Sequence, residues 1–237
     1  MKKIFTAFFF FFVISGIFSE AYAKNARSII SFGSYPYTKD AKKAPMQWIV
    51  LNVLPDGSML AISKYAIEAK NFNESPKHNI TWENSDLREW LNSSFISSAF
   101  SKSEQKKLKN IKVSGGDNNQ LKIKGGKETD DKVFLLSAEE AEEFFSSKKS
   151  RKLYPTPYVK NKKILMSNRG TVNWWLRTVG SRTDNGNMYP ANCGRTGCMT
   201  RVMTDGTVYF NGTMIQMQGQ ALYAIRPVIL IEPEQNK

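Results

Sequence analysis

Two cysteines are the residues of this chain best suited to covalent chemistry. Cys193 and Cys198 enclose the sequence Gly-Arg-Thr-Gly. A disulfide between them would close a very short loop, for which the chain-entropy model gives only about 2 kcal/mol of stabilisation. The two intervening glycines permit this tight closure. We therefore expect a local clasp that shapes its own loop and contributes little to the stability of the whole domain.

Histidine chemistry is narrowly limited. His78 is the only histidine, and it lies between Lys77 and Asn79. Metal sites built from several histidines are therefore excluded, and a Ser-His-Asp or Cys-His arrangement would depend entirely on this residue. We interpret His78 as an exposed loop residue, with a role as base or ligand as the alternative.

The candidates for ligand binding lie in the polar loop before the cysteines. They offer hydrogen-bonding groups and one aromatic face, which is the chemistry of glycan and peptide recognition. For each of them, a role as a turn residue is the alternative. A calcium ion at Asp184 and Asn185 would lack a full oxygen shell, because only one carboxylate and one amide are present. The candidates are Arg182, Asp184, Asn185, Asn187 and Tyr189.

Two apolar segments bracket this loop and must hold it in place. The segment Asn-Trp-Trp-Leu-Arg, which ends at Arg177, predicts a strand with Trp174 and Trp175 on opposite faces. One tryptophan should fill the core, and the other should lie under a loop or at the surface. Arg177 could stack on a ring or bind a carboxylate, although a structural role is the simpler interpretation. Residues 222–231 predict the last strand, where Pro227 indicates an edge or a bulge.

The remaining elements are short. Asp-Gly pairs flanked by apolar runs predict two hairpins, which join residues 47–54 to 58–63 and residues 199–203 to 207–210. An amphipathic pattern predicts a helix over residues 84–92.

A capping box at Ser137 predicts a second helix that runs through Phe145. Residues 114–131 predict a mobile loop, and residues 154–158 an extended segment. This order of elements predicts an α+β domain with short antiparallel strands, two to three helices and long loops.

The N-terminus has the pattern of a secretory signal peptide. Lys2 and Lys3 precede an almost wholly apolar run at residues 4–18, and Ala-Tyr-Ala at residues 21–23 forms a small-x-small cleavage site. A membrane anchor is the alternative, but this run is shorter than the ~20 residues that a spanning helix needs. We expect cleavage after residue 23, no membrane span in the mature chain, a single domain over residues 24–237, and a periplasmic or extracellular location.

The chain is strongly basic, with a formal net charge of +13, of which +12 remains after loss of the signal peptide. Such a charge attracts nucleic acid, anionic lipid and acidic polysaccharide without specificity. An exported protein rarely meets nucleic acid, and the lysine runs lack interleaved aromatic residues. We therefore expect a solvated basic surface and no nucleic-acid partner, with envelope polyanions as possible weak partners.

Seven segments resemble, in the same order, the motifs of an uncharacterised family of exported bacterial domains. In that family they recur as FGSYPQ, WIVL, SKY, WENSxLRxWLN, VFLLS, WWLRSPG and GVRP. The chain departs from these motifs at Thr178-Val179-Gly180, which replaces Ser-Pro-Gly, and at Ala224, which replaces a glycine. The segments here are FGSYP at 32–36, WIVL at 48–51, SKY at 63–65, WENSDLREWLN at 82–92, VFLLS at 133–137, WWLR at 174–177 and IRP at 225–227.

The resemblance covers nearly the whole mature chain and implies a C-type-lectin-like fold, related to that of the formylglycine-generating enzymes. In this fold, terminal strands pair and helices flank a sheet whose long loops bind ligands. The tripeptides by which calcium-dependent lectins of this fold bind sugar are absent from the part of the sequence that the resemblance covers. The residues that would determine the fold are Trp82, Trp90, Trp174, Trp175, Arg177 and Arg226.

Three functions are compatible with these patterns. The favoured one is a noncatalytic binding or adhesion module for a glycan or protein ligand at the cell envelope, with no cofactor. A structural envelope or assembly protein is the alternative. The third is a Cu(I)-dependent oxidase, because formylglycine-generating oxidases hold Cu(I) between two thiolates at a spacing that Cys193 and Cys198 resemble. A disulfide in an oxidising compartment is the competing interpretation of that pair.

Overall fold

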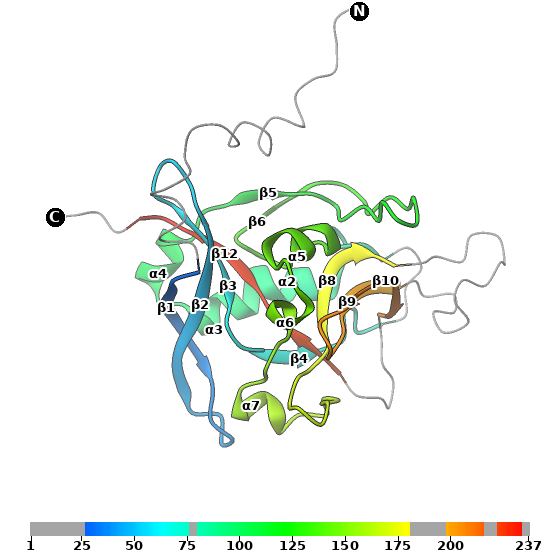
Figure 1. The fold of residues 1–237 in the computed structure, drawn as a ribbon. Helices are drawn as coiled ribbons and strands as arrows, with labels where there is room; N and C mark the ends of the chain where they lie inside the picture. Colours follow the sequence, from blue (N-terminus) through cyan, green and yellow to red (C-terminus); the bar gives the residue numbers. More distant parts are fainter. Residues whose placement is uncertain (1–26, 76–79, 181–197, 216–221, 234–237) are drawn as a thin grey trace, which may run out of the picture.

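The structure, a computed structural model, describes residues 27–75, 80–180, 198–215 and 222–233. These residues form two five-stranded sheets, in the orders β1-β2-β3-β12-β7 and β10-β9-β8-β11-β4, and a two-stranded sheet of β5 and β6 (Figure 1). Most strand pairs are antiparallel, and short helices pack around the sheets, so the predicted α+β class is confirmed. The first sheet contains β1 (Ile29–Pro36), β2 (Lys43–Val53), β3 (Met59–Ser63), β12 (Val228–Ile231) and β7 (Val133–Phe134).

Both predicted Asp-Gly hairpins are present. The first joins β2 to β3, and Gly57 in its turn has a φ of 80°. The second joins β9 to β10, where Gly206 has a φ of 91°. Side chains disfavour such positive angles, which explains the glycines. The second sheet contains β10 (Val208–Met214), β9 (Cys198–Val202), β8 (Trp174–Val179), β11 (Tyr223–Ile225) and β4 (Glu68–Lys70).

Strand β8 is buried on both faces. Trp174 and Trp175 point to opposite sides, and both have no exposed surface. Trp175 packs edge-on against Phe72, while Trp174 lies against the guanidinium of Arg226. All six residues of β8 are buried, although Arg177 and Thr178 interrupt its apolar sequence, and the guanidinium of Arg177 is accommodated by hydrogen bonds to Leu135 and Glu140.

The predicted last strand is wrong in one respect: residues 222–231 form two strands in different sheets. β11 lies between β8 and β4, and β12 lies between β3 and β7. Arg226 and Pro227 separate them, so neither an edge nor a bulge is needed to accommodate the proline. Because Pro227 lies between the ladders, its missing N–H removes no hydrogen bond from either sheet.

The described residues contain more helices than the two to three expected, and each helix is short. The first predicted helix begins after Ser85, whose side chain accepts a hydrogen bond from the Arg88 N–H, and continues through a π-helical turn. The expected capping box of Ser137 and Glu140 is formed. The helices are α2 (Asp86–Trp90), η1 (Leu91–Phe95), α3 (Ile96–Ala99), α4 (Lys102–Lys107), α5 (Ala138–Phe144), α6 (Lys148–Arg151) and α7 (Pro157–Lys160).

The expectation of an extended chain at residues 154–158 fails at its C-terminal half, where α7 begins. Thr156 accepts a hydrogen bond from the Val159 N–H, and Pro157 occupies the first helical turn. Proline suits this position because the N–H it lacks has no partner within the helix.

Residues 114–131 are not the plain mobile loop that was expected. Their C-terminal end forms β6 (Thr129–Asp131), which pairs with β5 (Ile111–Val113). The buried side chain of Asn118 donates to the carbonyls of Val179 and Phe210 at 2.8 and 2.9 Å. A Cβ at Gly125 would lie 2.2 Å from the Gly115 carbonyl oxygen, so the glycines permit close backbone packing.

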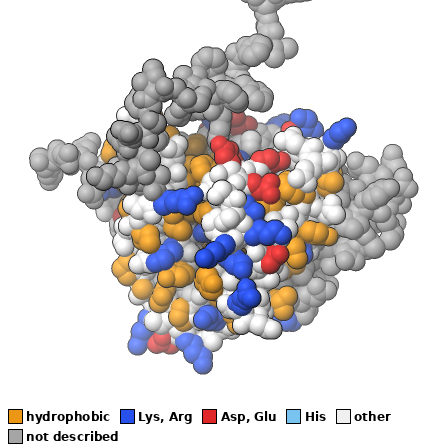
Figure 2. Space-filling model, in the orientation of Figure 1, with side chains coloured by type: hydrophobic (Ala, Val, Ile, Leu, Met, Phe, Trp, Pro, Cys, Tyr) orange, Lys and Arg blue, Asp and Glu red, His pale blue; other side chains and the backbone are white. Residues whose placement is uncertain are grey.

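The described residues contain no helix long and apolar enough to cross a bilayer. Lysine and arginine side chains are spread among hydrophobic and neutral ones over the face drawn in Figure 2. This distribution fits a solvated basic surface.

Candidate functional site

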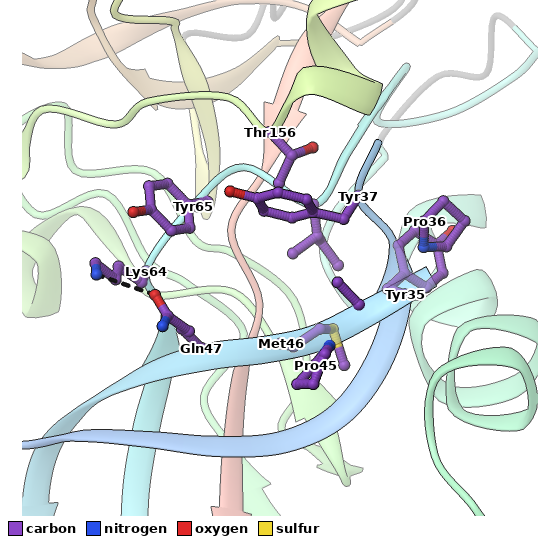
Figure 3. A pocket seen from close by; sticks show the side chains of 11 residues that line it. Tyr35, Pro36, Tyr37, Pro45, Met46, Gln47, Lys64, Tyr65 and Thr156 are labelled. Atoms are coloured by element: carbon purple, nitrogen blue, oxygen red, sulfur yellow. Dashed lines mark hydrogen bonds between the residues drawn. The ribbon is translucent and has the colours of Figure 1, made fainter. Parts of the chain in front are cut away.

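A cavity of about 350 Å³ opens at the end of the β1–β2 hairpin (Figure 3). We call it the tyrosine cavity, because three tyrosines line it. Most of the remaining lining is aliphatic, with a few polar side chains. The lining residues are Tyr35, Pro36, Tyr37, Ala44, Pro45, Met46, Gln47, Lys64, Tyr65, Ile67 and Thr156.

Four segments distant in sequence bring this lining together: the end of β1 with the residue after it, the start of β2, residues 64–67, and the cap of α7. Backbone hydrogen bonds fix them to one another. The Ala66 N–H donates to the Tyr154 carbonyl at 3.0 Å, and the Tyr158 N–H donates to the Tyr37 carbonyl at 2.8 Å. These two bonds therefore hold the residue after β1, residues 64–67 and the segment around α7 together at the cavity.

Polar and apolar groups occupy opposite ends of the cavity. Figure 3 shows Lys64, Gln47 and Tyr65 at one end, and Tyr35 and Pro36 at the other. The Lys64 ammonium donates to the Gln47 Oε1 at 3.0 Å and lies 5.1 Å from the centre of the Tyr65 ring. A ligand that fits this cavity would have an apolar face and hydrogen-bonding groups at one end.

A buried carboxylate holds the wall of the cavity from behind. The Glu68 Oε2 accepts hydrogen bonds from the hydroxyls of Tyr35 and Tyr158 at 3.2 and 3.4 Å. The Glu68 Oε1 accepts from the Ala69 N–H at 2.8 Å and forms an ion pair with Lys162.

These contacts raise the pKa values of two groups bonded to Glu68, Tyr35 and Lys162. Burial, followed by the charge of Glu68, raises the pKa of Tyr35 above its ordinary range. Burial alone would lower the pKa of Lys162, but its hydrogen bonds and the charges of Glu68 and Tyr158 outweigh this and raise it. At neutral pH, Tyr35 is thus a neutral donor and Lys162 a cation.

The ligand-binding candidates from the sequence fall outside the described residues. Arg182, Asp184, Asn185, Asn187 and Tyr189 all belong to the segment at residues 181–197. The calcium and loop-surface predictions therefore stay predictions.

The cysteine pair is described only in part. Cys198 begins β9 and is buried, whereas Cys193, like His78, lies outside the described residues. Both the disulfide and the copper interpretation stay predictions. Within residues 27–75, 80–180, 198–215 and 222–233, no three or more His, Cys, Asp or Glu side chains are grouped so as to hold a metal ion.

The six motif residues lie in the core or against it, away from the lining of the tyrosine cavity. Arg177 forms a bidentate pair with Glu140, with both nitrogen–oxygen distances at 2.5 Å, and also donates to the carbonyls of Leu135 and Ser114. Trp82 donates its indole N–H to the fully buried carboxylate of Asp131 at 2.8 Å. Trp90 is partly buried and packs against the core.

The sequence contained a weak signal for the tyrosine cavity. Tyr35 and Pro36 belong to the FGSYP segment, and Lys64 and Tyr65 belong to the SKY segment. Proline and lysine are mostly exposed in proteins, so Pro36 and Lys64 indicate surface positions, whereas Tyr35 also belongs to the core. The remaining lining residues carry no such signal, because only the tertiary fold brings them together.

Comparison with known proteins places the chain without naming an activity. No curated protein matches it, and no solved structure matches it. A family model described as a domain of unknown function, DUF6273, matches residues 56–233. This range includes Lys64 and Tyr65 of the polar end of the tyrosine cavity, but not Gln47, and it includes every strand from β3 to β12. The chain belongs to the DUF6273 family.

Proposed function

We propose that this protein is an exported, noncatalytic binding module whose tyrosine cavity holds one sugar unit of a glycan. The observation that carries the proposal is the lining of the cavity, which places tyrosine and aliphatic surface beside Gln47 and Lys64. A sugar ring offers the complementary chemistry, because it combines an apolar face with hydroxyl groups. Aromatic surface with a few polar groups that fix orientation is typical of small-ligand sites.

The titratable groups near the cavity favour binding over catalysis. A general base must reach the proton that it removes. The Glu68 carboxylate already accepts hydrogen bonds from Tyr35, Tyr158 and the Ala69 N–H, and it is paired with Lys162. Glu68 therefore acts as a support for the cavity wall.

The family resemblance and the N-terminal pattern agree with this proposal. The motifs imply a C-type-lectin-like fold, in which ligands bind at the surface of a rigid scaffold. Strands β1 and β12, near the two ends of the described chain, lie in the same sheet, but β2 and β3 separate them, so the direct pairing of terminal strands that the resemblance implies is not found in the described residues. Residues 1–23 would direct the protein to the cell envelope or beyond, where glycans are abundant.

A glycan array probed with the purified protein tests the proposal. We expect binding to a defined set of glycans that falls about tenfold or more in a Tyr37→Ala and Tyr65→Ala double variant, because both rings line the cavity. The matched control is Tyr154→Ala, a tyrosine that is 50% exposed and does not line the cavity. An array without signal, or equal binding by the double variant, would contradict the proposal.

A further inference from the structure

Arg201 places a guanidinium on the sheet β10-β9-β8-β11-β4, outside the lining of the tyrosine cavity. Arg201 on β9 pairs directly with Tyr209 on β10 and with Trp175 on β8. Residues opposite one another in adjacent strands share one face of a sheet. The Arg201 Cζ lies 4.8 Å from the centre of the Tyr209 ring and 5.2 Å from the centre of the Tyr223 ring. Two tyrosines thus flank one guanidinium group.

Among the residues that the structure describes, none accepts a hydrogen bond from this guanidinium. The Arg201 Nε is buried and has no hydrogen-bond partner. Its two terminal nitrogens also donate to no oxygen among the described residues, and they are not sealed from solvent, since Arg201 as a whole is only half-buried. An arginine has five N–H donors, and a buried donor left without an acceptor costs about 1 to 3 kcal/mol.

The other arginines of the packed interior differ from Arg201. Arg177 is saturated by a carboxylate, two carbonyls and a hydroxyl. Arg151 donates to the carbonyls of Gly206 and Phe145. Arg226 donates to the Ser63 carbonyl and is 2% exposed, so that no ligand can reach it. Arg201 has donors without an acceptor among the described residues and also has access from solvent.

We propose that Arg201 binds an oxyanion, the carboxylate or sulfate group of an acidic sugar. Both tyrosine rings contact the guanidinium, so an anion would approach the edge that faces solvent, where two parallel N–H···O bonds can form. The rings also keep the guanidinium in one orientation, which lowers the entropy lost on binding. Within the described residues no carboxylate lies within 4 Å of this group to compete for it.

The test follows the Nε–H resonance of Arg201 by NMR in the nitrogen-15-labelled protein, with an Arg201→Lys variant to assign it. The probes are glucuronate, glucose 6-sulfate and glucose. We expect a saturable shift with one or both acidic sugars and none with glucose, and the ratio of the two affinities identifies carboxylate or sulfate as the preferred group. Arg201→Gln should weaken binding of the preferred probe about tenfold or more. The control Arg169→Gln, at an exposed arginine, should leave it unchanged.

Two outcomes would overturn the proposal. In one, the resonance does not respond to either acidic sugar, which makes the two tyrosines simple packing partners of Arg201. In the other, both acidic sugars and chloride shift the resonances of Arg201 and Arg169 equally, which indicates nonspecific attraction to a basic protein. The wild-type titration alone distinguishes these results, so the test does not depend on the folding of a variant. Loss of glycan binding at the tyrosine cavity would not affect it.

Discussion

The ion pair of Glu140 and Arg177 shows how one residue joins local and tertiary structure. Glu140 closes the capping box of α5, where its carboxylate accepts a hydrogen bond from the Ser137 N–H at 2.9 Å. The same carboxylate holds the guanidinium of Arg177, whose side chain is 2% exposed. The carboxylate therefore fixes the start of a helix and neutralises a cation inside β8.

Replacement of Glu140 by glutamine should destabilise the protein strongly. Removing one partner of a buried pair leaves an uncompensated charge, which costs roughly 3 to 5 kcal/mol. Because the Glu140 side chain keeps 21% of its surface exposed, we expect the lower end of this range in urea unfolding at pH 7. The control Glu142→Gln changes an exposed carboxylate of the same helix and should have little effect.

The same pair predicts how stability changes in acid. Burial alone would raise the pKa of Glu140, but the charge and hydrogen bonds of Arg177 outweigh this and lower it. A carboxylate with a lowered pKa contributes stability above its unfolded value, about 4.3, and loses it as the pH falls through the folded value. The stability difference between wild type and Glu140→Gln should therefore shrink below pH 4. A constant difference down to pH 2 would contradict this explanation.

The groups bonded to Glu68, Tyr35 and Lys162, predict a loss of stability in alkali. The pKa values of Tyr35 and Lys162 are both raised in the folded state. Their contribution is complete below the unfolded values of about 10, and it is lost as the pH rises through the folded values. Above pH 10, the free energy of unfolding measured in urea should thus fall more steeply with pH for the wild type than for Tyr35→Phe. The exposed Tyr154→Phe variant should retain the wild-type slope.

At the scale of elements, two glycines with positive φ angles allow the cost of a strained backbone to be distinguished from the cost of a steric clash. Gly206, in the β9–β10 turn, and Gly170 both have positive φ angles, of 91° and 77°. A Cβ at Gly206 would lie 1.9 Å from the Lys148 carbonyl oxygen, whereas a Cβ at Gly170 would meet nothing within 4 Å. The hairpin turn is therefore pressed against the start of α6.

Alanine at these two positions should have unequal effects. Gly170→Ala carries only the cost of a left-handed backbone, about 1 to 2 kcal/mol. Gly206→Ala adds a clash with backbone that cannot move without displacing α6, so we expect it to lower the free energy of unfolding by clearly more. Thermal or urea unfolding of the two variants checks this order. Equal effects would show that α6 moves freely away from the turn.

The accuracy of the sequence predictions depended on how local each signal was. The Asp-Gly turns and the Ser137 capping box depend on residues next to one another, and these elements were predicted. The start of α7 was not predicted, because the residue before a proline favours an extended backbone, although Thr156 caps the turn that Pro157 begins. The packing of Gly115 against Gly125 and Gly126 and the lining of the tyrosine cavity were missed because both arise from tertiary contacts.

At the scale of the whole molecule, the C-terminal strands join the two sheets. Only Arg226 and Pro227 separate β11 from β12, so the chain passes directly from one sheet to the other. Arg226 strengthens this connection: its Nε donates to the Ser63 carbonyl on β3 at 3.1 Å, and its Cζ lies 5.1 Å from the centre of the Trp174 ring on β8. One continuous set of buried side chains spans both sheets.

This connection predicts that the two sheets unfold together. Hydrogen exchange should give the same opening free energy for the slowest amides of β2 and of β8, because neither sheet keeps a core of its own once the other opens. Arg226→Lys loses the stacked planar guanidinium and should lower both values equally, whereas Arg169→Lys, at an exposed position, should change neither. If the amides of β8 exchanged at a much lower free energy than those of β2, the second sheet would be a separate unit, and Arg226 would serve only its local packing.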